Sequence, residues 1–61
     1  MTELELKQLE FRSRIIISEH WCIIWWEPSE SLFHIVVMPS ETEVTGETLD
    51  EAIQRAEESI V

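Results

Sequence analysis

Basic residues are scarce in this chain of 61 amino acids, which has four Lys and Arg against thirteen Asp and Glu and a formal net charge of −9. The imbalance is greatest in residues 28–61, where Arg55 is the only base beside eight acids. Binding to a phosphate backbone or to an anionic membrane surface requires clustered Lys and Arg. We therefore expect no direct nucleic-acid partner and no membrane partner, whereas a basic protein would be attracted.

Cysteine and long apolar runs are equally scarce. Cys22 is the only cysteine, so no disulfide can form within the chain, and its apolar neighbours predict a buried, inert thiol. The longest uncharged apolar run, residues 21–26, is far too short to span a bilayer. No basic segment followed by an apolar run opens the sequence, so we expect no signal peptide and a reducing, cytoplasmic compartment.

The chain is also too short for a Rossmann domain, a TIM barrel or a two-domain enzyme. A chain of this length buries only about 60% of its unfolded surface, which allows one small domain at most. Hydrophobic residues nevertheless make up 44% of the sequence, which argues against disorder. We therefore treat residues 1–61 as a single folded domain.

Three segments carry the β-branched and aromatic residues typical of strands, at residues 11–18, 21–27 and 32–38. The second and third are joined by Pro28 and three polar residues, a turn chemistry too short for a parallel crossover. These two strands are therefore predicted to pair antiparallel. Residues 40–46 are polar apart from one valine and are assigned to no strand.

The N-terminal segment, residues 1–10, is ambiguous. Leu4 and Leu6 alternate as in a strand, whereas Leu9 and Phe11 have the opposite parity, which a bulge or turn would reconcile. A short helix is the rival interpretation, and the sequence does not decide between them.

The clearest local pattern lies at residues 48–60 and predicts an amphipathic helix. Thr48 is a candidate N-cap, and Glu51 three residues later completes a capping box. Gly46 allows a tight turn before the helix. The apolar stripe recurs at helical spacing and consists of Leu49, Ala52, Ile53, Ala56 and Ile60. We predict an α+β domain, with a small antiparallel sheet of three strands, or four if residues 1–10 add one, and this C-terminal helix packed on one face.

Both faces of the predicted sheet are apolar, although one helix covers only one of them. Because consecutive strand residues alternate sides, Trp25 and Trp26 lie on opposite faces, and one of them is left uncovered. A large exposed apolar patch marks an interface, and the simplest closed arrangement is a two-fold homodimer. The predicted interface residues are Trp21, Trp25, Trp26, Ile24, Phe33, Ile35 and Val37.

No constellation of residues predicts a reaction. His20 and Cys22 share one parity along a strand, but no second cysteine or histidine cluster supports a metal site. A nucleophile–base pair of Cys22 with His34 lacks an orienting third group and an oxyanion hole. His34 is interpreted as a packed, hydrogen-bonded histidine. We therefore expect no enzymatic activity, no catalytic or metal-binding residue and no cofactor.

Residues 25–60 contain a strand that ends in Glu27, a short turn, a second strand, a loop beginning at Pro39 and the sequence GETLDEA at residues 46–52. This order resembles the HicB-like antitoxin domain. The turn PSES replaces the Gly-containing turn of that family, and the strand before Trp21 is additional. The resemblance implies a stand-alone, non-enzymatic protein-binding module that masks a small basic ribonuclease toxin of the HicA type. No ribbon–helix–helix or helix-turn-helix segment follows in this sequence, so operator binding is not expected.

The acidic balance also supports a hypothesis of another class, a small phage-type inhibitor or nucleic-acid mimic that occupies a basic cleft of a host protein. Such mimicry is electrostatic, so added salt should weaken it. Binding that is insensitive to salt would contradict this alternative.

Overall fold

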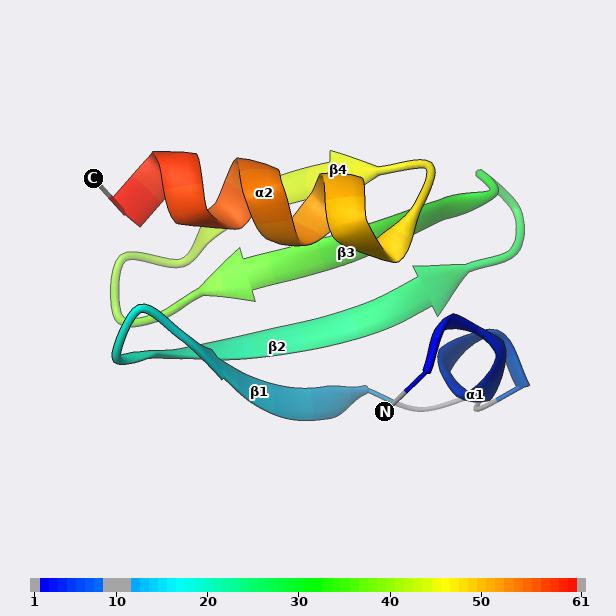
Figure 1. Ribbon diagram of the computed structural model, residues 1–61, viewed down its shortest axis with the longest axis horizontal. Coiled ribbons are helices and arrows are strands. Elements are labelled where there is room, and N and C mark those ends of the chain that lie inside the picture. Colours follow the sequence, from blue (N-terminus) through cyan, green and yellow to red (C-terminus); the bar gives the residue numbers. More distant parts are fainter. Residues whose placement is uncertain (1, 9–11, 61) are drawn as a thin grey trace.

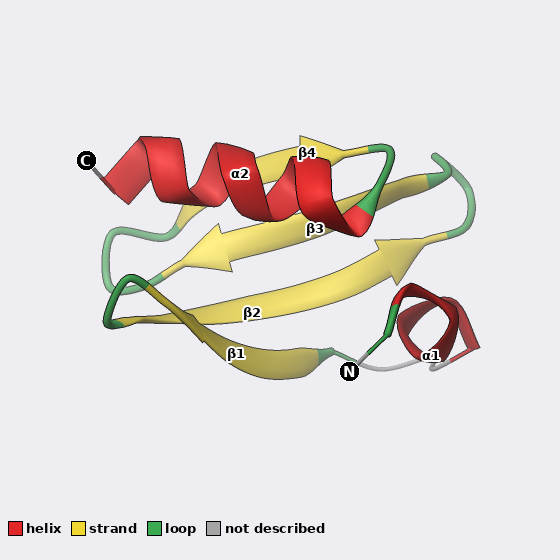
Figure 2. Ribbon diagram, in the orientation of Figure 1, coloured by secondary structure: helices red, strands yellow, loops and turns green. Residues whose placement is uncertain are grey.

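The computed structural model describes residues 2–8 and 12–60, which form two helices and one antiparallel sheet (Figure 1). The elements are α1 (Glu3–Gln8), β1 (Ser13–Ile17), β2 (His20–Glu27), β3 (Leu32–Val37), β4 (Thr42–Gly46) and α2 (Leu49–Ile60). The four strands pair in chain order, each antiparallel to the next. Both helices lie on one side of the sheet, with α2 along β3 and β4 and α1 near the end of β2 (Figure 2). The predicted α+β class is therefore confirmed.

The strand connections are short and place residues other than glycine in the left-handed region of φ. Ser18 and Glu19, which join β1 to β2, have φ values of 47° and 66°. Two such residues define a type I′ hairpin turn, whose twist matches that of the flanking strands. The next two connections have four residues each and end in Ser31 and Glu41, with φ values of 55° and 59°. Each connection thus uses a conformation that favours Gly.

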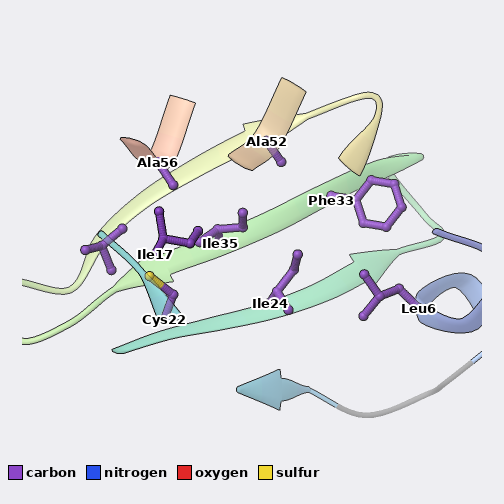
Figure 3. Close-up of a cluster of buried hydrophobic side chains, with 9 residues drawn as sticks. Leu6, Ile17, Cys22, Ile24, Phe33, Ile35, Ala52 and Ala56 are labelled. Atoms are coloured by element: carbon purple, nitrogen blue, oxygen red, sulfur yellow. The ribbon is translucent and has the colours of Figure 1, made fainter. Parts of the chain in front are cut away.

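The core lies between the sheet and the helices (Figure 3). Phe33 and Ile35 of β3 and Ala52 and Ala56 of α2 are all completely buried. The small alanine side chains allow the helix backbone to approach the sheet closely. The other buried apolar residues are Leu6, Ile17, Cys22, Ile24 and Val37.

Gly46 permits the closest contact between β4 and α2. A Cβ atom at this position would lie 2.5 Å from the backbone nitrogen and 2.8 Å from the Cα of Ala52. Its φ does not lie in the left-handed region. The glycine is therefore needed for close helix approach, and not for the tight turn that the sequence suggested.

The N-terminal segment is helical over Glu3–Gln8, which selects one of the two interpretations left open for it. Leu6 is only 2% exposed and joins the core. The Glu3 carboxylate accepts a hydrogen bond from the backbone N–H of Leu49 at 2.7 Å. It thereby satisfies a free donor at the start of α2. The predictions for residues 1, 9–11 and 61, including the opposite parity of Leu9, lie outside the described residues.

The fourth strand arises where no strand was predicted. β4 pairs with β3 through Val44 opposite Ile35 and Gly46 opposite Phe33, and α2 packs over it. Only Val44 contributes an apolar side chain. Backbone pairing with β3 and packing against α2 therefore stabilise this strand more than its amino-acid composition does. The fourth strand of the sheet is therefore β4, and not residues 1–10.

The start of α2 is capped as Thr48 suggests, since its Oγ1 accepts a hydrogen bond from the backbone N–H of Glu51 at 3.1 Å. The Glu51 carboxylate forms an ion pair with Arg55 at 2.6 Å. The reciprocal half of the predicted capping box is therefore replaced by an i,i+4 pair. The three larger residues of the stripe, which pack partly buried against the core, are Leu49, Ile53 and Ile60.

Candidate protein-interaction surface

The face of the sheet opposite α1 and α2, here called the open face, carries four rows of side chains that cross the strands. The apolar row consists of Ile16, Trp21 and Met38; Ile16 pairs with Trp21, and the Met38 N–H donates to the Trp21 carbonyl at 2.8 Å. The charged row consists of Arg14, Ile23, Val36 and Glu43. The histidine row consists of Arg12, Trp25, His34 and Thr45. The fourth row consists of Glu27 and Leu32. The face thus combines apolar side chains with charged groups on both central and edge strands.

The apolar row is the most exposed part of this face. Ile16 and Trp21 are each 60% exposed although they are opposite each other on neighbouring strands. Arg14, Ile23 and Met38 join Trp21 in lining a shallow groove. Exposed aromatic and β-branched side chains that are contiguous in this way are characteristic of protein-contact surfaces.

His34 lies at the centre of the histidine row and is only 8% exposed. Its Nδ1 lies 3.0 Å from Glu43 Oε2 and its Nε2 lies 2.6 Å from Glu30 Oε1. The imidazole also stacks on Trp25, with ring centroids 5.1 Å apart and an interplanar angle of 18°. Arg12 lies over the Trp25 ring at 4.2 Å. The network thus holds one histidine between two carboxylates and an aromatic ring.

The two carboxylates set the charge of this histidine. Burial by itself lowers the pKa of His34, but hydrogen bonds and charge from Glu43 and Glu30 outweigh that effect, and the pKa is raised above its ordinary value. In the protonated ring both N–H groups donate to the carboxylates. The two carboxylates therefore favour the protonated ring over the neutral one, and they occupy both ring nitrogens.

Cys22 and His34 lie on opposite faces of the sheet. Cys22 faces the helices and is 1% exposed, and burial raises the pKa of its thiol despite a backbone hydrogen bond from Ile17. The structure therefore separates the two residues considered as a nucleophile–base pair. Within residues 2–8 and 12–60, no group of three or more His, Cys, Asp or Glu is arranged to hold a metal ion. In the same part of the chain, neither helix has the length and apolar character needed to cross a membrane.

The predicted interface residues are divided between the two faces. Trp21 and Trp25 lie on the open face. Trp26 lies on the helix-covered face, where it packs on Phe33 with ring centroids 4.6 Å apart and lies beneath the Lys7 ammonium. Ile24, Phe33, Ile35 and Val37 are buried to 3% exposure or less on that same face. These four residues therefore belong to the core of the single chain and not to its exposed surface, and Trp26 is partly buried on the helix side of the sheet.

The division of these residues between the two faces has a physical reason in strand parity. The parity that carries Arg14, His34 and Glu43 requires solvent or polar partners, so the parity with fewer charged residues, that of Ile24, Phe33 and Ile35, turns toward the helices. The sequence interpretation consequently missed Ile16, Ile23, Val36 and Met38, together with the two glutamates that hold His34. The parity of Arg14 and His34 was the available signal for the apolar positions of the open face.

No family model, no curated protein and no solved structure matches this chain. The fold and the surface define it as a small α+β protein built on a four-stranded antiparallel meander. Among the elements that the structure describes, both helices lie on one face of that sheet and leave the other face uncovered (Figure 2).

Proposed function

We propose that this chain is a non-enzymatic protein-binding module whose contact surface is the open face of the sheet. The observation that carries the proposal is the adjacent pair Ile16 and Trp21, each 60% exposed. An aromatic side chain of this kind buries about 150–250 Å². Removing the exposed part of Trp21 from water would contribute on the order of 2–4 kcal/mol. A partner that covers this pair therefore gains appreciable binding energy.

The non-enzymatic part of the proposal is supported by the positions of the two most reactive side chains. Both nitrogens of His34 are engaged by carboxylates, so the ring presents no free base. The Cys22 thiol is buried under the helices. Neither group is offered to a substrate.

The proposed module resembles a stand-alone HicB-like antitoxin domain, and its partner is then a small basic protein of the HicA type. The outward side of α2 supports this choice, because Asp50, Glu57 and Glu58 are exposed there. A net charge of −9 increases the encounter rate with a basic protein at low ionic strength. The antitoxin thus combines an apolar contact face with an acidic helix surface.

Growth rescue tests the proposal. We expect a HicA-type ribonuclease to be encoded beside this reading frame. The chain is co-expressed with that ribonuclease, and we expect growth to be restored. Trp21→Lys should abolish rescue because it places a charge in the centre of the apolar row. Leu4→Lys is the matched control, since Leu4 is 64% exposed on α1, on the helix side of the sheet, and this variant should still rescue.

Two results would contradict the proposal. Failure of the folded wild-type chain to rescue growth or to bind the ribonuclease would remove the antitoxin function. Equal rescue by wild type and Trp21→Lys would remove the open face as the contact surface. If Trp21→Lys leaves the affinity unchanged and high salt abolishes binding, the acidic inhibitor or nucleic-acid mimic would instead be favoured.

A further inference from the structure

We propose that the open face binds the open face of a second copy of this chain. The two copies are related by a two-fold axis that lies between the two sheets, parallel to the strands and above the gap between β2 and β3. This inference rests on the proposed function in taking the open face as a contact surface. It goes further by naming a second copy as the occupant of that face when no ribonuclease is bound, and by giving the geometry of the pair. The observations that carry it are the order of residues along the rows and the distribution of charge.

The charged row is complementary to its own reverse. It crosses the sheet from Arg14 on β1 through Ile23 and Val36 to Glu43 on β4. A two-fold axis parallel to the strands reverses the order of the strands across the sheet, so β1 of one copy lies opposite β4 of the other. Arg14 then faces the partner's Glu43, and Ile23 faces the partner's Val36, while the symmetric contacts repeat both pairs. A two-fold interface requires this self-complementarity of one patch.

The neighbouring rows are compatible with the same axis. In the apolar row, Trp21 faces the partner's Met38, which combines an aromatic ring with a polarizable thioether. In the histidine row, Trp25 faces the partner's His34. Trp21 and Trp25 of β2 thereby both meet side chains of the partner, and the two tryptophans of the open face are removed from water.

The charge distribution also permits a second copy at this face. Arg12 and Arg14 lie on the same face as Glu27, Glu30 and Glu43, so the net charge of the face is small compared with the −9 of the whole chain. The surplus of acids lies elsewhere, in particular on the outward side of α2. Two chains of charge −9 can therefore approach through the open face while their acidic helices point away from each other.

The placement of the helices also suits this occupant. Two aligned sheets pack about 10 Å apart, so α1 and α2 remain on the outside of the pair.

The first experiment measures the mass of the purified chain by light scattering and sedimentation at micromolar concentration. We expect the mass of two chains for the wild type and of one chain for Trp21→Lys. Leu4→Lys, which changes an equally exposed leucine on the helix side, should keep the mass of two chains. Circular dichroism and the urea midpoint verify that each variant is folded.

The second experiment tests the axis by charge reversal. Arg14→Glu places a carboxylate opposite the partner's Glu43, and Glu43→Arg places a guanidinium opposite the partner's Arg14. Each change should weaken the homodimer at least about tenfold, because like charges then meet twice across the interface. An equimolar mixture of the two variants should restore a dimer, since both facing pairs again have opposite charge.

The restoration cannot arise within one chain. Arg14 and Glu43 are separated by the two central strands, a distance of about 14 Å. Glu30 still holds His34 in the Glu43→Arg variant, and both altered side chains are exposed, so the fold should tolerate the changes.

A wild-type chain that stays monomeric at these concentrations would overturn the inference. A dimer that is unaffected by Arg14→Glu, or that the mixture does not restore, would overturn the axis. These outcomes are separate from those of the proposed function. A monomer that neutralises the ribonuclease through Trp21 leaves that function standing, and a dimer that neutralises nothing leaves this inference standing.

Discussion

His34 shows how a single buried polar residue is accommodated on a sheet that is otherwise apolar at its centre. It makes one contact with Glu43 on the neighbouring strand and one with Glu30 in the β2–β3 connection, and its ring stacks on Trp25. The two carboxylates are half-exposed, so they remain solvated while they bind the ring. The cation is therefore stabilised without burying an unpaired charge.

This network predicts that the free energy of unfolding decreases as the pH is raised above the unfolded pKa of histidine, about 6.5. The pKa of His34 is raised in the folded state, so its stabilising contribution is complete below the unfolded value of about 6.5. The contribution is lost as the pH rises through the folded value. Urea titrations at several pH values measure this slope.

The two histidines allow a matched comparison for this slope. His34→Gln should flatten the pH dependence above a pH of about 6.5, whereas His20→Gln leaves the network intact and should retain it. A slope in His34→Gln equal to that of the wild type would mean that another group is responsible.

Gly46 leads to a second prediction at the residue scale. Gly46→Ala should destabilise the protein by about 1–3 kcal/mol, because the new methyl group overlaps the backbone of Ala52 and forces α2 away from β4. Glu47→Ala at the adjacent exposed position serves as the control and should change the urea midpoint little. An unchanged midpoint in Gly46→Ala would show that the helix can move away at no cost.

At the scale of elements, the hairpin between β1 and β2 has the geometry of an Asn-Gly turn but lacks both residues. Replacing Ser18 by Asn and Glu19 by Gly should stabilise the protein by about 0.5–1 kcal/mol, since both positions have positive φ. Thermal unfolding measures the gain. Ser29→Gly changes a turn position where φ is not positive, and it should not raise the melting temperature. This control would show that the gain at residues 18 and 19 comes from their positive φ.

The start of α2 provides the second prediction at this scale. Thr48→Ala should cost about 1 kcal/mol, because it leaves the Glu51 N–H without its cap. Glu51→Gln should cost only a few tenths of a kcal/mol, since that carboxylate is occupied by the exposed Arg55 pair. Thr48→Ser retains the hydroxyl and serves as the control. Equal losses from the first two changes would indicate that a full capping box forms in solution.

At the scale of the whole molecule, the surplus of acids opposes the compact state. The last turn of α2 contains Glu57 and Glu58 and no base, although the helix dipole favours a cation there. Raising the salt concentration from about 0.01 to 0.15 M should therefore stabilise the chain, by about 0.5–1 kcal/mol, as repulsion is screened. Urea titrations of dilute protein measure this effect.

Removing two of these charges gives the matched comparison. The double change Glu57→Gln and Glu58→Gln should raise the stability at low salt and reduce its dependence on salt. A chain that salt destabilises would show that attractive pairs such as Glu51–Arg55 outweigh the net repulsion.

Local pattern was sufficient for the elements that have a strong period or a cap. The apolar runs predict β1, β2 and β3. Thr48 and the apolar stripe that follows it predict α2 within a residue or two of its observed bounds. These features depend on neighbours within a few positions of the chain. They are therefore readable from sequence without knowledge of the fold.

Three features were decided only by the tertiary structure. α1 forms because Leu6 enters the core and Glu3 caps α2, a contact between residues 46 positions apart. β4 forms because the edge of β3 and the underside of α2 accept a strand that has one apolar side chain, Val44. The His34 network assembles because the β3–β4 register brings Glu43 to a histidine nine positions away.

The choice of which sheet face becomes the core shows this division most clearly. The sequence by itself determined that both parities are apolar and that one helix leaves one of them uncovered. The hydrophobic pattern around Trp25 and Trp26 did not distinguish the two parities, and the only local signal was the charge of Arg14 and His34 on one of them. The folded structure buries the parity of Phe33 and Ile35 under Ala52 and leaves Trp21 exposed. The physical reason is that burying the other parity would have desolvated the charges of its row, a cost that only the assembled sheet imposes.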